Sequence, residues 1–173
     1  MKFRELVDNL RILNTILSEI YFKIYRSLEE NKLQDFWYNL CEQKQKLAGE
    51  MLYLESLKKF DEETIDVDRD VINSVLLKIK KNFDEIPEKL TIEDALKITF
   101  NVESSIINAL LFTILEKAQE SIPESIDHII NIFLPSHIMQ VMDTIIENSK
   151  DPHLVEKARL NKMTWSYKSG RKI

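Results

Sequence analysis

The chain has 173 residues, of which 44% are apolar, and it contains only two Gly, four Pro and one Cys. Turns need Gly and Pro, so this composition excludes a fold built from β-strands, and the single Cys41 excludes an intrachain disulfide or a four-cysteine zinc site. A net charge of −5 argues against general nucleic-acid binding. We therefore expect an all-α protein that is soluble and cytoplasmic, without a signal peptide or a membrane-spanning helix.

Leucine and isoleucine recur at alternating spacings of three and four residues, which predicts long amphipathic helices. The order is two long helices, a crossover of roughly 30 residues that is long enough to traverse a bundle, and two more long helices. Pro135 is expected to bend the last long helix. The helices are expected at residues 3–30, 33–59, 69–83, 92–120, 122–148 and 151–163. One bundle domain is expected over residues 1–150, followed by a short helix and a basic tail over residues 151–173.

Three polar residues fall on the apolar faces of these predicted helices. On a helical wheel, Glu103 lies at the centre of the apolar stripe of the third long helix, and His137 has the same position on the fourth. The stripe of the second long helix passes through Lys44, between Leu40 and Leu47. Because a buried unpaired charge is very costly, these groups must pair, bind a ligand or be less buried than the pattern indicates.

Four segments resemble the helices of rubrerythrin-type ferritin-like proteins. ALKITFNVESSIINALLFTILEKA, residues 95–118, is similar to the third helix of that family, and Glu103 falls on its metal-binding Glu. HIMQVMDTI, residues 137–145, looks like the fourth helix from its metal-binding His onward, and residues 36–52 and 16–30 resemble the second and first helices. The resemblance implies a ferritin-like four-helix bundle with a long crossover between the second and third helices.

The resemblance also implies the positions of a di-iron site. At several of these positions, this sequence has a different residue from the family's metal ligand. The family uses a Glu on the first and third helices and a Glu-x-x-His on the second and fourth. Here Lys44 and Leu47 stand at the Glu and His positions of the second helix, and Leu134 stands at the Glu position of the fourth. On the first helix, either Glu19 or Ser18 takes the ligand position.

Glu103 and His137 are the ligands that remain, so the resemblance implies a degenerate di-iron site and no bound cofactor. We expect Lys44, Glu103 and His137 to form a buried polar cluster, in which Lys44 supplies the positive charge that iron once supplied. In the alternative, Glu19, Glu103 and His137 still hold iron or another divalent metal.

The C-terminal residues 157–173 carry basic side chains and no acidic ones, with Trp165 and Tyr167 interleaved. Such a tail is suited to docking on an acidic partner protein, an anionic lipid surface or nucleic acid, and the plainer interpretation is a solvated end or a tail packed on the acidic body. The basic residues are Lys157, Arg159, Lys162, Lys168, Arg171 and Lys172.

These patterns favour a non-catalytic structural or interaction protein over an enzyme. One alternative is an oxidoreductase that acts on peroxide or dioxygen through a partial iron site. Another is a small-ligand-binding module that uses the space of the lost site. Apolar surface on the first and third long helices, together with Trp37 and Trp165, predicts a homodimer, and no nucleic acid partner is expected.

Overall fold

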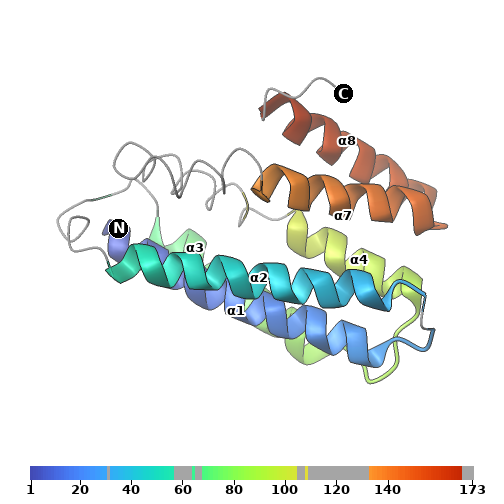
Figure 1. Ribbon diagram of the computed structural model, residues 1–173, viewed down its shortest axis with the longest axis horizontal. Coiled ribbons are helices and arrows are strands. Elements are labelled where there is room, and N and C mark those ends of the chain that lie inside the picture. Colours follow the sequence, from blue (N-terminus) through green and yellow to red (C-terminus); the bar gives the residue numbers. More distant parts are fainter. Residues whose placement is uncertain (31, 57–63, 65–67, 105–107, 109–132, 169–173) are drawn as a thin grey trace. The chain divides into compact units, whose positions relative to one another are not determined.

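The computed structural model describes two compact units, which divide the chain at Ile92 and Glu93 (Figure 1). Among the described residues it contains six helices and no strand, so the all-α prediction is confirmed. None of these helices combines the length and the apolar character that a membrane span needs. The described residues are 1–30, 32–56, 64, 68–104, 108 and 133–168.

The first unit is built on an antiparallel helix pair, α1 (Phe3–Ser27) and α2 (Gln34–Ser56), which lie side by side in Figure 1. The predicted repeat becomes the buried face of each helix, because these spacings place the side chains on one side. Burying one Leu or Ile side chain contributes roughly 1.5–3 kcal/mol, so this seam is the main stabilising feature of the unit. Its fully buried members include Leu6, Leu10, Leu13, Leu17, Ile20, Ile24, Trp37, Leu40 and Met51.

A third helix, α3 (Arg69–Glu85), occupies the predicted crossover and packs against α1. The carboxylate of Asp68 caps its first turn by accepting a hydrogen bond from the Asp70 backbone N–H at 2.9 Å. At its other end, Lys23 Nζ on α1 donates to the Phe83 carbonyl at 2.9 Å. The chain then runs beside the end of α1, where the Leu90 N–H donates to the Ser27 carbonyl at 2.7 Å.

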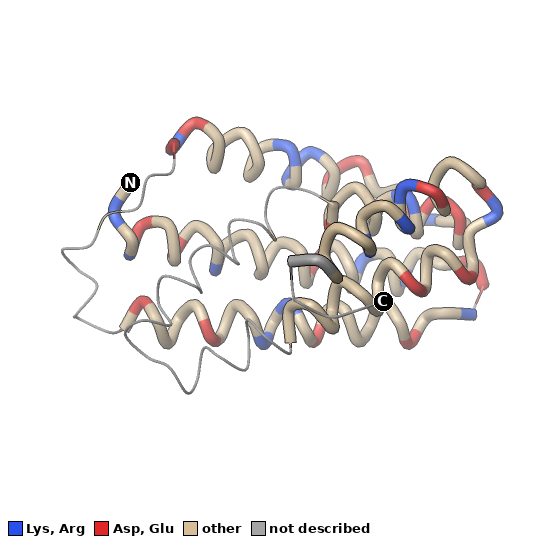
Figure 2. Tube along the Cα trace, turned by 90° about the horizontal axis from the view of Figure 1, so that it is seen from above, with Lys and Arg blue, Asp and Glu red and all other residues tan. Residues whose placement is uncertain are grey.

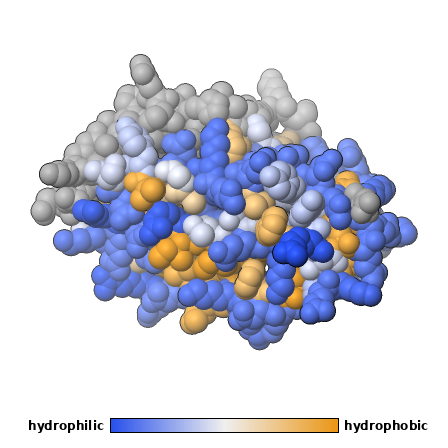
Figure 3. All heavy atoms as spheres, turned by 60° about the horizontal axis from the view of Figure 1, so that its bottom comes forward, coloured by the Kyte–Doolittle hydropathy of each residue, from blue (hydrophilic) through white to orange (hydrophobic). Residues whose placement is uncertain are grey.

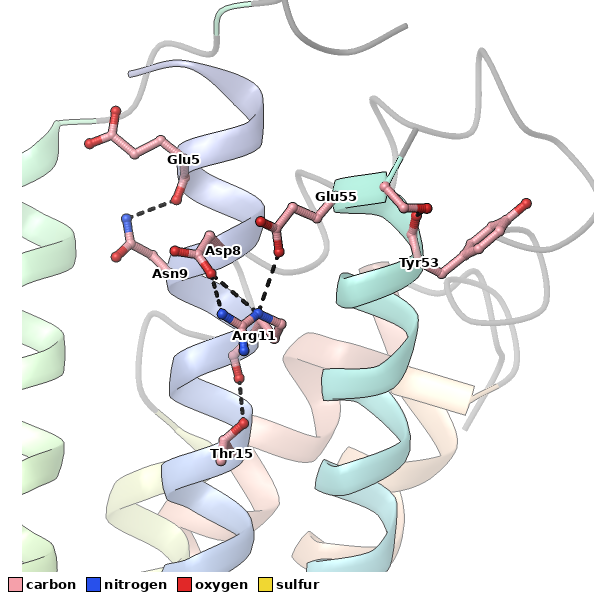
Figure 4. A network of polar contacts seen from close by, with 8 residues as sticks. Glu5, Asp8, Asn9, Arg11, Thr15, Tyr53 and Glu55 are labelled. Carbon is pink, nitrogen blue, oxygen red and sulfur yellow. Dashed lines mark hydrogen bonds and ion pairs between the residues drawn. The ribbon is translucent and has the colours of Figure 1, made fainter. Parts of the chain in front are cut away.

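Charged side chains form ion pairs between the three helices of this unit. Figure 4 shows Arg11 of α1 between Asp8, one turn earlier, and Glu55 of α2, at 2.5 Å and 3.5 Å. Arg69 of α3 pairs with Glu5 of α1 at 2.6 Å. All of these groups are at least partly exposed, so each pair contributes little, and their effect is to fix the register of the helices.

The second unit contains α4 (Ile92–Glu103), α7 (Leu134–Asn148) and α8 (Pro152–Lys168) (Figure 1). Helix α8 packs along α7, and Glu93 joins the start of α4 to the α7–α8 connection by accepting hydrogen bonds from Ser149 Oγ at 2.6 Å and the Lys150 N–H at 2.9 Å. The core of this unit includes Ala95, Leu96, Val102, Leu134, Ile138, Val141, Met142, Ile145 and Ala158.

The predicted helix boundaries agree closely for α1, α2, α3 and the start of α4, which begins directly after Thr91 as expected. The last helix is longer than predicted and extends to Lys168. The described part of α4 ends at Glu103, and the remainder of the predicted helix to residue 120 lies outside the described residues. The same is true of residues 122–132.

Pro135 lies near the start of the described part of α7, and residues 122–132 before it lie outside the described residues. The bend expected at Pro135 therefore stays a prediction. The arrangement of the helices as a ferritin-like four-helix bundle stays a prediction.

Candidate functional site

Glu103 is the last residue of α4, and its side chain is only 1% exposed. Its Oε2 atom lies 3.1 Å from Nε2 of His137 on α7, which is equally buried. Helical spacing explains the burial, because each residue shares a face with the core residues of its own helix. The two polar groups expected at the centres of two apolar faces are thus neighbours within the second unit.

Asn108 completes this pair and was not identified from the sequence. Its Nδ2 donates to Oε2 of Glu103 and to the Glu103 backbone carbonyl, both at 2.8 Å. The second bond satisfies a carbonyl at the end of α4, where helix carbonyls lack partners. Among the described residues, Asn108 Oδ1 is buried and accepts no hydrogen bond.

Apolar and locally bonded side chains surround the Glu103–His137–Asn108 cluster, as we call these three residues. The Phe133 ring stacks on the His137 ring at a centroid distance of 6.4 Å. One turn before Glu103, buried Thr99 donates its hydroxyl to the Ala95 carbonyl at 2.8 Å. The carboxylate is therefore removed from water, and a hydrogen bond from Asn108 and the adjacent imidazole replace part of its hydration.

Lys44 is also fully buried, on α2 in the first unit. Its pairing with Glu103 of the second unit stays a prediction. On α1, Ser18 is 4% exposed, whereas Glu19 lies on the exposed face, and which of them takes the ligand position that the resemblance implies stays open. Ser18 Oγ donates to the Thr15 carbonyl at 2.7 Å, so it is satisfied within its own helix.

The described residues do not supply the ligand set of a di-iron site as the resemblance implies it. In the described part of the chain, no three His, Cys, Asp or Glu residues gather around a point that a metal ion could occupy. Leu47 and Leu134 are buried apolar side chains at two of the family's ligand positions, and Glu19 lies on an exposed face. Two bridged cations need several anionic ligands to balance their charge, and this set does not supply them.

The basic residues of the C-terminus have different surroundings. Lys162 pairs with Asp143 across the α7–α8 interface, while Arg159 lies 3.9 Å from Glu156 on its own helix. Trp165 is 7% exposed and belongs to the core of the second unit. The Lys168 side chain, Arg171 and Lys172 lie outside the described residues. The described part of the basic tail is therefore packed on the second unit.

Comparison of the chain with protein-family models, with curated proteins and with solved structures finds no match in any of the three. The likeness to rubrerythrin-type proteins therefore rests on the quoted sequence segments alone.

Proposed function

We propose that this protein is a ferritin-like helical bundle without a working di-iron centre, and that it serves as a non-catalytic structural or interaction protein of the cytoplasm. The observation that carries the proposal is the burial of the Glu103–His137–Asn108 cluster. A catalytic carboxylate or imidazole has to reach its substrate, whereas Glu103 and His137 are 1% and 2% exposed. Glu103 Oε2 lies 3.1 Å from His137 Nε2 and accepts a hydrogen bond from Asn108 Nδ2 at 2.8 Å.

Interaction with other chains is supported by apolar side chains that remain on the surface. Figure 3 shows such residues in patches among hydrophilic ones on one face of the molecule. The larger ones among the described residues include Leu52, Tyr53, Leu77, Leu160 and Met163, which are 49–69% exposed. We propose a homodimer, which light scattering at tens of micromolar would reveal as twice the chain mass. The basic tail is proposed to contact an acidic partner protein.

The stability of cluster variants tests the proposed structural role. Removing one member of a buried polar pair leaves the other without its partner, which costs about 1–3 kcal/mol and more for a charged group, while replacing both by apolar residues is often neutral. We therefore expect Glu103→Leu and His137→Leu each to lower the free energy of unfolding strongly in urea melts, and the double variant to recover most of the loss. Glu147→Leu, an exposed site on α7, is the matched control and should change stability by less than about 0.5 kcal/mol.

Additive losses in the double variant would contradict a paired structural core. The same cycle with Lys44→Met in place of His137→Leu asks whether Lys44 is a further partner of Glu103. A Lys44→Met cost that disappears in the Glu103→Leu background would show that the two residues are coupled.

A second candidate is an oxidoreductase that retains one metal ion and acts on peroxide or dioxygen. The observation in its favour is the 3.1 Å separation of Glu103 Oε2 and His137 Nε2, because one divalent ion at about 2.1 Å from each atom would give a similar separation. The buried Asn108 Oδ1 is a possible third ligand. Such an ion would raise the melting temperature of the wild type but not of His137→Gln.

A further inference from the structure

The first unit carries a groove that the proposed function does not use. Its volume is about 680 Å³, which lies within the range of small-molecule sites. Residues of α1, residues of α2 and the segment around Phe83 line it, and none of them belongs to the Glu103–His137–Asn108 cluster.

The middle of the groove is aromatic. Phe22 and Tyr38 line it and are 42% and 43% exposed, which is unusual for side chains of this size. Tyr25 lies between them, with ring centroids 6.0 Å from Phe22 and 5.7 Å from Tyr38. These rings present apolar surface with partly negative faces, which attract cations.

The basic and the acidic side chains that line the groove differ in whether they contact other groups of the protein. Its cations are already engaged: Lys23 donates to the Phe83 carbonyl and lies 4.8 Å from that ring centroid, and the Arg26 guanidinium lies 6.0 Å from the Phe22 ring. Its acids are Glu19, Glu42 and Glu88. Within the described part of the chain, none of these carboxylates has an ion pair or a hydrogen bond, and with Lys23 and Arg26 as the only cations of the lining the groove carries a net negative charge. Figure 2 shows acidic and basic residues distributed along the helices as a whole.

Glu19 and Glu42 lie at the same level of the helix pair, because α1 and α2 run antiparallel and the two residues are equally far from the connection between them. We propose that this groove binds a small organic cation, an ammonium group carrying an apolar or aromatic body. The ammonium lies between the carboxylates of Glu19 and Glu42, and the apolar body lies against Phe22 and Tyr38. An anionic ligand is disfavoured because three carboxylates stand against two cations in the lining.

Cys41 offers a direct readout, since it lines the groove and is the only cysteine of the chain. The thiol is 5% exposed, and burial, followed by the charge of Glu42, raises its pKa. Its alkylation by N-ethylmaleimide is therefore slow, and a bound molecule slows it further. The test compares benzyltrimethylammonium with uncharged benzyl alcohol and anionic benzenesulfonate on the full chain. Ligand-observed NMR gives the dissociation constants independently of the thiol.

We expect benzyltrimethylammonium alone to protect Cys41. Glu19→Gln/Glu42→Gln should weaken its binding roughly tenfold, the combined effect of two exposed charge pairs. Glu29→Gln/Glu30→Gln removes the same charge from exposed positions outside the lining and should leave binding unchanged. Equal protection by benzyl alcohol, equal weakening in both double variants, or no protection by the cation would each overturn the proposal.

Discussion

Leu33 is the residue at which the α1–α2 connection departs most from ordinary backbone geometry. Its φ angle is +69°, in the left-handed region that costs a residue with a Cβ atom roughly 1–2 kcal/mol. The chain turns at Leu33, and α2 starts at the next residue. The Phe36 N–H donates to the Leu33 carbonyl at 3.0 Å. The helix pair therefore imposes the strained conformation on a residue that is not suited to it.

Two substitutions at this position should reveal the strain. Leu33→Ala removes the side chain and keeps the strain, whereas Leu33→Gly removes both. We expect the Gly variant to be the more stable one by about 1 kcal/mol in urea melts, the reverse of the usual order in which Gly is the weaker residue. An Ala variant that is as stable as the Gly variant would show that the positive φ carries no cost.

Single residues were predicted well where helical spacing decides their position. Glu103, His137 and Lys44 are buried because they share faces with leucine and isoleucine. Asn108 was missed because it lies five residues after Glu103, a spacing that a continuous helix does not place on the same face. The structure nevertheless places Asn108 Nδ2 2.8 Å from Glu103 Oε2, a contact that a helical wheel does not predict.

Gly49 lies inside α2 and is exposed. A Cβ atom built at this position meets no atom within 4 Å, so a methyl group fits there without any displacement. Gly in a helix interior is unfavourable because it loses more backbone freedom on folding. Gly49→Ala should therefore stabilise the protein by roughly 0.5–1 kcal/mol, measured by urea or thermal unfolding. A destabilised variant would mean that α2 is not a regular helix at this position.

Asp151 begins α8 by accepting hydrogen bonds at Oδ1 from the backbone N–H groups of His153 and Leu154, at 2.9 Å and 3.3 Å. The Leu154 N–H is the largest influence that holds the pKa of this carboxyl below its ordinary value of 3.8, and the His153 N–H and Lys97 act in the same direction. The charged form is therefore favoured in the folded state. Its contribution is fully present above the unfolded-state pKa and is lost as the pH falls through the folded-state pKa.

Asp151→Asn isolates the charge, because Asn retains the capping oxygen. We expect the wild type to melt at a higher temperature than this variant near neutral pH. The difference in melting temperature should stay constant down to about pH 5 and shrink as the pH falls below the ordinary pKa of an aspartate. Other carboxylates titrate alike in both proteins and do not contribute to the difference. A difference that persists unchanged in acid would assign the effect to something other than the Asp151 charge.

At the scale of elements, the apolar repeat was sufficient to predict α1, α2 and α3. A long amphipathic stripe of this spacing is compatible with few structures other than a helix. In the structure, the side chains of Asp68 and Asp151 cap the starts of α3 and α8. The groove of the first unit could not be predicted, since it combines the outer faces of α1 and α2 with a segment near residue 83. The spacing of residues along the sequence predicts the faces of each helix separately. It does not predict which outer faces of different helices lie next to each other.

At the scale of the whole molecule, the chain combines two units of different character. The first is a helix pair with a long apolar seam. Helix α3 packs against this pair through an ion pair and a hydrogen bond to the backbone. The second encloses a carboxylate and an imidazole in its core. The sequence predicted the helix content of both, while the arrangement of the units as one ferritin-like bundle depends on contacts that helical periodicity does not specify.

Metal content after loading tests the structural role of the Glu103–His137–Asn108 cluster most directly. The wild-type protein and His137→Gln would be incubated with excess iron(II) without oxygen, then exposed to air, desalted and measured by elemental analysis and absorption spectroscopy. We predict far less than one tightly held ion per chain, with no difference between the two proteins, because the ligand set is incomplete. Two retained irons with an oxo-bridge absorption band, or one retained ion that is lost in His137→Gln, would contradict the structural role.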